Sequence, residues 1–249
     1  MTIARSSCVG DRMRVTGPTV SELAIDTATA ACAVALRVDG ETFDHAPAPG
    51  RMLERPAHAK ELLPAIESLC NESGTELAEL TSIAVGVGPG AFTGLRIGVS
   101  TARAIATANG LGLVPVSSLE TLIAGGGTDQ TVIAMIDARR NEVFYRVGEG
   151  PDSLASPAET LSVVRDAVAR GSVLAIGDGA LKFREQLFAL GAEVPSGDDD
   201  RHVVNATMML DIAASQTPLA PEAVTPNYIR APDAKVSSRE SWLVESEAK

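Results

Sequence analysis

Asp26 is the first residue whose type and position suggest chemistry. It ends the apolar stretch Leu23-Ala-Ile-Asp and is followed by Thr27 and Thr29. A carboxylate and hydroxyls at a strand end could face a metal and a phosphate, which makes Asp26 and Thr27 candidate cofactor-binding residues. The same side chains also bond neighbouring backbone groups in turns. We favour the turn, because the rest of a nucleotide site looks incomplete.

The glycine-rich segment 86–94 is a second candidate site. Backbone amides at the start of a helix attract anions, so the segment could hold a phosphate. It lacks the G-K-[ST] of a phosphate-binding loop, and Ala91 and Thr93 stand where the third glycine of G-x-G-x-x-G would be. We therefore interpret it as a sharp strand-to-helix turn with close backbone packing.

Metal and nucleophile chemistry find little support. His45, His58 and His202 show no ligand spacing, and there is no G-x-S-x-G motif. The three cysteines are far apart without a CxxC pair, which favours a reducing cytoplasm over a disulfide framework. We predict no catalytic residue, no metal ligand and no cofactor.

The elements that must position these residues alternate between strands and helices. The periodicity predicts strands over 23–26, 32–38, 41–46, 82–87, 113–116 and 132–137, and helices over 57–73 and 92–109. The first three strands form an antiparallel meander, and the later ones turn parallel. A second half repeats this theme from Val132, including a Gly177-Asp-Gly179 turn, which suggests a duplicated unit.

This order predicts an α/β protein of the actin/Hsp70/sugar-kinase class, built from two ribonuclease-H-like subdomains. We expect a disordered extension over 1–20, subdomains over 21–125 and 126–235, and a tail over 236–249. The net charge of −11 argues against strong nucleic-acid binding by the chain alone. No apolar run is long enough to cross a membrane.

Three segments resemble the TsaB (YeaZ) family. Leu23-Ala-Ile-Asp-Thr-Ala-Thr is similar to the family's N-terminal hairpin, and His58-Ala-Lys-Glu-Leu-Leu-Pro64 is similar to its H-S-E-x-L-L-P helix. The most specific match is the segment 86–98, which is close to the signature G-x-G-P-G-S-F-T-G-x-R-I-G. Pro226-Asn-Tyr-Ile-Arg230 resembles the family's C-terminal P-x-Y-L-R.

The resemblance implies a non-catalytic subunit that binds TsaD, which transfers threonylcarbamoyl to N6 of adenosine 37 of tRNA. TsaE, an ATPase, joins the larger assembly, and tRNA is reached only through the complex. The metal-binding H-x-x-x-H of TsaD is missing here, because Ser118 and Leu122 stand at its two positions. The alternative is a nucleotide-binding hydrolase or peptidase, in which Asp26, Thr27 and 177–179 would bind phosphate.

The two helices 57–73 and 92–109 are the expected partner surface. Small residues recur every four positions on the second helix, and such a face lets another helix approach closely. The predicted interface comprises His58, Leu62, Leu63, Ile66, Gly94, Gly98, Ala102 and Ala106. Gly98→Leu or Ala102→Arg is then expected to break the heterodimer and leave the monomer folded. A homodimer could use the same face, and so could packing against the chain's own sheet.

Overall fold

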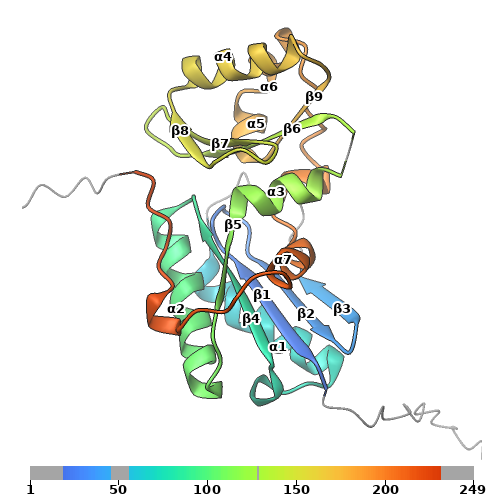
Figure 1. The fold of residues 1–249 in the computed structure, drawn as a ribbon, viewed down its shortest axis with the longest axis vertical. Helices are drawn as coiled ribbons and strands as arrows, with labels where there is room; N and C mark the ends of the chain where they lie inside the picture. Colours follow the sequence, from blue (N-terminus) through green and yellow to red (C-terminus); the bar gives the residue numbers. More distant parts are fainter. Residues whose placement is uncertain (1–18, 46–55, 128, 231–249) are drawn as a thin grey trace, which may run out of the picture.

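The computed structural model describes residues 19–45, 56–127 and 129–230 (Figure 1). Its first sheet has the strand order β3-β2-β1-β4-β5. Strand β2 is antiparallel to both β1 and β3, whereas β4 runs parallel to β1 and β5 runs parallel to β4, as predicted. The strands are β1 (Ser21–Asp26), β2 (Ala33–Val38), β3 (Glu41–His45), β4 (Ser82–Gly88) and β5 (Val114–Ser117).

The second sheet, of four strands, repeats the order of the first four strands of the first sheet. Its order is β8-β7-β6-β9, with β7 antiparallel and β9 parallel to β6. Glu193 forms a parallel bridge to Leu174, at the position that β5 occupies in the first sheet. The duplication inferred from the sequence is therefore present in the topology. The strands are β6 (Thr131–Asp137), β7 (Val143–Val147), β8 (Ser153–Ala155) and β9 (Val173–Ile176).

Helices cover both sheets and fill the space between them (Figure 1). Helices α1 and α2 pack on one face of the first sheet, α3 and α7 lie between the sheets, and α4 to α6 cover the outer face of the second sheet. The helices are α1 (His58–Ser73), α2 (Phe92–Asn109), α3 (Ser118–Gly126), α4 (Pro157–Val168), α5 (Asp178–Lys182), α6 (Arg184–Ala189) and α7 (Ala206–Ala213). Short 3-10 turns are η2 (Leu77–Glu79), η3 (Asp200–His202) and η4 (Pro221–Ala223).

Successive side chains of a strand point to opposite faces of its sheet, and this alternation divides the core into layers. Leu23 and Ile25 of β1 pack towards α1 and α2, whereas Ala24 between them joins the core between the sheets. Strand β6 does the same, since Ile133 faces α4 to α6 and Ala134 faces the shared core. The shared core joins the two halves over a continuous apolar surface.

The predicted fold class, two ribonuclease-H-like subdomains of the actin/Hsp70/sugar-kinase type, is confirmed. The subdomain limits 21–125 and 126–235 stay a prediction, and α7 from the second range packs on the first sheet. Val20 is already bonded to Asp39 through its N–H. The rest of the predicted extension (1–18) and the tail 236–249 lie outside the described residues.

Candidate functional site

Asp26 lies at the centre of a buried turn between β1 and β2. Its Oδ1 accepts the N–H of Ala28 at 2.8 Å, and its Oδ2 accepts the hydroxyl of Ser118 at 2.5 Å. Thr27 donates its hydroxyl to the carbonyl of Gly94 at 2.8 Å. Asp26 and Thr27 are both almost fully buried, so the turn interpretation describes their contacts. Neither side chain is available to a ligand in this conformation.

Glycines from β4 and α2 close around this turn. A Cβ on Gly86 would stand 1.9 Å from Asp26 Oδ2, and one on Gly90 would stand 2.4 Å from the carbonyl oxygen of Ala28. A Cβ on Gly94 would lie 2.2 Å from the carbonyl oxygen of Thr27, and one on Gly98 would lie 2.3 Å from its hydroxyl oxygen. The glycine-rich segment thus allows close backbone packing, which needs residues without a side chain.

Because of this packing, most of the residues predicted for the partner surface lie inside the chain. Seven of the eight residues predicted for it are buried inside the chain, namely His58, Leu62, Ile66, Gly94, Gly98, Ala102 and Ala106. Only Leu63 is exposed, with 59% of its surface accessible. The small-residue face of α2 is directed at the chain's own β1–β2 turn and sheet. Gly98→Leu and Ala102→Arg are therefore expected to disrupt the monomer itself, contrary to the first expectation.

Several other residues singled out in the sequence also belong to the interior. His58, predicted for the partner surface, begins α1 and is buried, and burial lowers its pKa, which keeps the ring neutral. Ser118 is fully buried on Asp26, and Leu122 is part of the core between the sheets. The two positions that the resemblance aligns with the H-x-x-x-H of TsaD therefore hold a hydrogen-bonded hydroxyl and an apolar side chain.

In the second half, the turn after β9, which corresponds to the β4–α2 turn of the first half, holds the buried carboxylate of Asp178. Asp178 accepts the N–H of Asp137 at 3.0 Å, and the Gly177 N–H donates to Nδ1 of the buried His202 at 3.1 Å. Nε2 of His202 lies 3.2 Å from the carbonyl of Pro195, and burial lowers the histidine pKa, so the neutral ring with hydrogen on Nε2 fits both contacts. The Gly-Asp-Gly pattern indicated this turn in the sequence. No sequence pattern indicated that His202 would bond to it.

Burial raises the pKa of Asp26 to about 6, against the lowering effect of its bonds to Ser118 and Ala28. An aspartate with a raised folded-state pKa binds its proton more tightly when folded, so its stabilising contribution is complete at low pH. That contribution is lost as the pH rises from about 4 to about 6.

As the pH rises from 4 to 7, we expect the free energy of unfolding of Asp26→Asn to increase by about 2–3 kcal/mol relative to that of the unaltered chain. Urea unfolding at a series of pH values measures this change. Asp166→Asn on the exposed face of α4 is the control. A difference between Asp26→Asn and the unaltered chain that stays constant with pH would show that folding does not raise the pKa of the Asp26 carboxyl.

In 19–45, 56–127 and 129–230 there is no group of three or more His, Cys, Asp or Glu side chains placed to hold a metal ion. Within the same residues no helix is both long and apolar enough to cross a membrane.

Comparison with known proteins points to one family. Residues 53–175 match the family model of TsaD, the tRNA N6-adenosine threonylcarbamoyltransferase. The tRNA threonylcarbamoyladenosine biosynthesis protein TsaB of Escherichia coli is 41% identical over 128 residues, 49% of this chain and 52% of that protein. The TsaB of Haemophilus influenzae is 39% identical over 51% of its length, so this chain spans about half the length of these two relatives.

Longer matches come from a mycobacterial relative and a solved structure. An uncharacterized protein of Mycobacterium tuberculosis is 33% identical over 86% of this chain and 93% of that protein. The structure of YeaZ from Pseudomonas aeruginosa is 29% identical, covers 84% of this chain and all of that one, and superposes with a TM-score of 0.68. Both halves of the fold are therefore shared with these relatives.

Proposed function

This chain belongs to the TsaB (YeaZ) family, and we propose that it is the non-catalytic subunit that binds TsaD in tRNA threonylcarbamoyladenosine biosynthesis. In this role it supports the transfer of threonylcarbamoyl to N6 of adenosine 37. The observation that carries the proposal concerns Ser118 and Leu122, the two positions that the resemblance aligns with the metal-binding histidines of TsaD. Ser118 donates to the buried Asp26 and Leu122 packs in the core, so neither is placed to bind a catalytic metal.

The proposed partner surface is the outer face of α2 together with Leu63 of α1. Phe92, Arg96, Ser100 and Ala104 are exposed and recur every four residues, so they form one stripe along α2. A shallow hollow follows its first part, lined by Phe92, Thr93, Arg96, Ile97, Ser100 and Thr101. The side chains beyond Arg96 are short, which suits close approach of a partner helix.

The buried face of α2 supports this surface without being part of it. Gly94 and Gly98 fix the helix on the Thr27 turn. On the outer face, Phe92 and Arg96 contact Tyr228, and Ser100 and Ala104 are exposed. Phe92 and Arg96 are of the residue types that dominate protein interfaces. Helix α2 also has no acidic residue, although the chain as a whole carries a net charge of −11.

Complex formation with purified TsaD tests the proposal. We expect the mixture to elute from gel filtration as a one-to-one heterodimer, with its mass measured by light scattering. Elution of the two proteins at their separate positions would contradict the proposal. A second copy of this chain could use the same stripe, and the mass of the chain alone measures that competing homodimer. TsaE is proposed to join the heterodimer, and its addition to the column extends the same experiment.

A further inference from the structure

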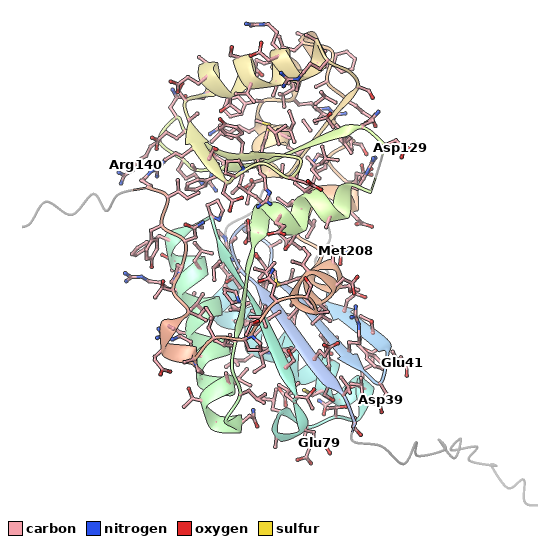
Figure 2. All side chains as sticks on the ribbon, viewed as in Figure 1. Asp39, Glu41, Glu79, Asp129, Arg140 and Met208 are labelled. Atoms are coloured by element: carbon pink, nitrogen blue, oxygen red, sulfur yellow. The ribbon has the colours of Figure 1, made fainter. Side chains whose placement is uncertain are left out.

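The C-terminal motif Pro226-Asn-Tyr-Ile-Arg230 crosses from the end of β4 to the second half of the molecule. The N–H of Asn227 donates to the carbonyl of Val87 at 2.7 Å. At the other end, Arg230 pairs with the carboxylate of Glu142. Figure 2 shows this segment passing the start of α2 and reaching the β6–β7 loop. The chain is therefore fixed on both sides of the tyrosine in the motif.

This tyrosine forms one cluster with two residues of α2. Nε of Arg96 donates to the hydroxyl oxygen of Tyr228 at 3.1 Å. The guanidinium carbon of Arg96 lies 3.9 Å from the centre of the Phe92 ring. The rings of Phe92 and Tyr228 lie 5.3 Å apart between their centres, at an angle of 33°. Each of the three side chains thus contacts the other two, and we name them the Tyr228 cluster.

The Tyr228 cluster keeps its binding groups exposed. Phe92 and Tyr228 are 52% and 43% exposed, and Arg96 is exposed as well. The bond to Tyr228 uses only the Nε–H of Arg96, and the N–H groups on Nη1 and Nη2 remain. Among the residues that the structure describes, no carboxylate pairs with Arg96. The cluster therefore offers one cation and two apolar rings to a partner.

We propose that the Tyr228 cluster receives an acidic side chain of TsaD together with an apolar one next to it. The carboxylate accepts from Nη1 and Nη2 of Arg96, and the apolar side chain packs on the exposed rings. Tyr228 acts as the positioning residue, because its hydroxyl holds the guanidinium in place. The inference rests on the proposed function and names the chemistry of the contact at the start of the α2 stripe.

Continuity with the stripe favours a protein as the occupant. Phe92 and Arg96 are the first two residues of that stripe, so a partner helix lying along Ser100 and Ala104 reaches the cluster. Arginine and aromatic residues are enriched among the side chains that contribute most to protein binding. A planar guanidinium also matches a carboxylate in two parallel hydrogen bonds. The net charge of −11 disfavours nucleic-acid phosphate as the alternative anion.

Positioning by Tyr228 matters because a free arginine side chain loses much rotamer freedom when it binds. The contacts to Phe92 and Tyr228 restrict Arg96 before TsaD arrives, so less freedom is lost on binding. The motif at the end of the chain thereby contributes to a surface that otherwise belongs to α2. This gives the P-x-Y-L-R resemblance a role in partner binding.

The test is Tyr228→Phe, which removes the hydroxyl that accepts from Arg96 and retains the ring. Affinity for purified TsaD is measured by isothermal titration calorimetry. We expect about three- to fivefold weaker binding, with a melting temperature within about 2 °C of the unaltered chain. Tyr228→Ala, which also removes the ring, is expected to weaken binding by about thirtyfold.

A double-mutant cycle separates positioning from an independent contact. Arg96→Gln removes the charge and is expected to weaken TsaD binding by about tenfold, with a smaller dependence of the affinity on salt. In that background Tyr228→Phe is expected to have no further effect, because its hydroxyl acts through Arg96. Additive losses of affinity would overturn the positioning role.

Phe188→Ala is the matched control, since it removes a ring that is 74% exposed on α6 of the second half. It is expected to leave TsaD affinity unchanged. Unchanged affinity of Tyr228→Phe and Tyr228→Ala, while the unaltered chain binds, overturns this inference and leaves the proposed function standing. A clear drop in the melting temperature of Tyr228→Phe would mark a structural role and overturn it too. If the unaltered chain does not bind TsaD, both proposals fail.

Discussion

Gly86→Ala is expected to lower the free energy of unfolding by about 3 kcal/mol or more. The new Cβ would lie 1.9 Å from Oδ2 and 2.7 Å from Cγ of Asp26. Neither strand can move easily, because β1 and β4 are paired in register through Ile25 and Val85 in the core. Urea unfolding followed by circular dichroism measures the loss, and the melting temperature is expected to fall by about 6–12 °C.

A double-mutant cycle assigns this cost to one contact. Asp26→Ala removes the two closest atoms and leaves only Asp26 Cβ, at 3.1 Å. In that background Gly86→Ala is expected to cost less than about 1 kcal/mol, a coupling of about 2 kcal/mol. Gly171→Ala is the matched control, since no atom lies within 4 Å of its new Cβ. Additive effects of the two substitutions would show that Gly86 is needed for another reason.

Ala104→Arg is expected to abolish binding to TsaD, weakening the heterodimer by about a hundredfold or more, or about 2.7 kcal/mol. Ala104 is exposed and is the last residue of the proposed stripe, so a long charged side chain there blocks a partner helix without entering the core. The monomer should keep its melting temperature. Gel filtration with TsaD measures binding, and transfer of threonylcarbamoyl to tRNA should fall with it.

Two comparison variants make this result specific. Ala169→Arg places the same side chain at the exposed end of α4, in the other half, and should bind TsaD normally. Ala102→Arg, on the buried face of the same helix, should fail to fold, because Ala102 is fully buried. Normal heterodimer formation by Ala104→Arg would remove α2 from the partner surface.

Local signals explain which elements could be predicted from the sequence. Helix α2 was predicted over 92–109 and occupies Phe92–Asn109. Its end is recognisable because Gly110 takes the left-handed conformation, with a φ of 65°, that glycine adopts without strain. The β1–β2 hairpin follows from alternating apolar residues. Both features depend on residues that are close in the sequence.

Long-range contacts explain what was missed. The small-residue stripe on α2 was correctly seen, but the residue that it faces, Thr27, lies 67 positions before Gly94. Periodicity identifies a face that packs closely and carries no information about what packs there. The left-handed run at Arg139 to Asn141 was also invisible, since it contains no glycine and depends on contacts from Arg230. The return of α7 to the first sheet has no local signal either.

Reconstitution of the tRNA modification shows directly whether this chain is an accessory subunit. Purified TsaD, TsaE and the synthase of threonylcarbamoyl-adenylate are incubated with unmodified tRNA, with and without the chain, and modified adenosine 37 is quantified. We expect modification to depend on the chain and to be lost with Ala104→Arg but not with Ala169→Arg. Equal modification with and without the chain would contradict the proposed role, and an independent activity of this protein would then have to be sought.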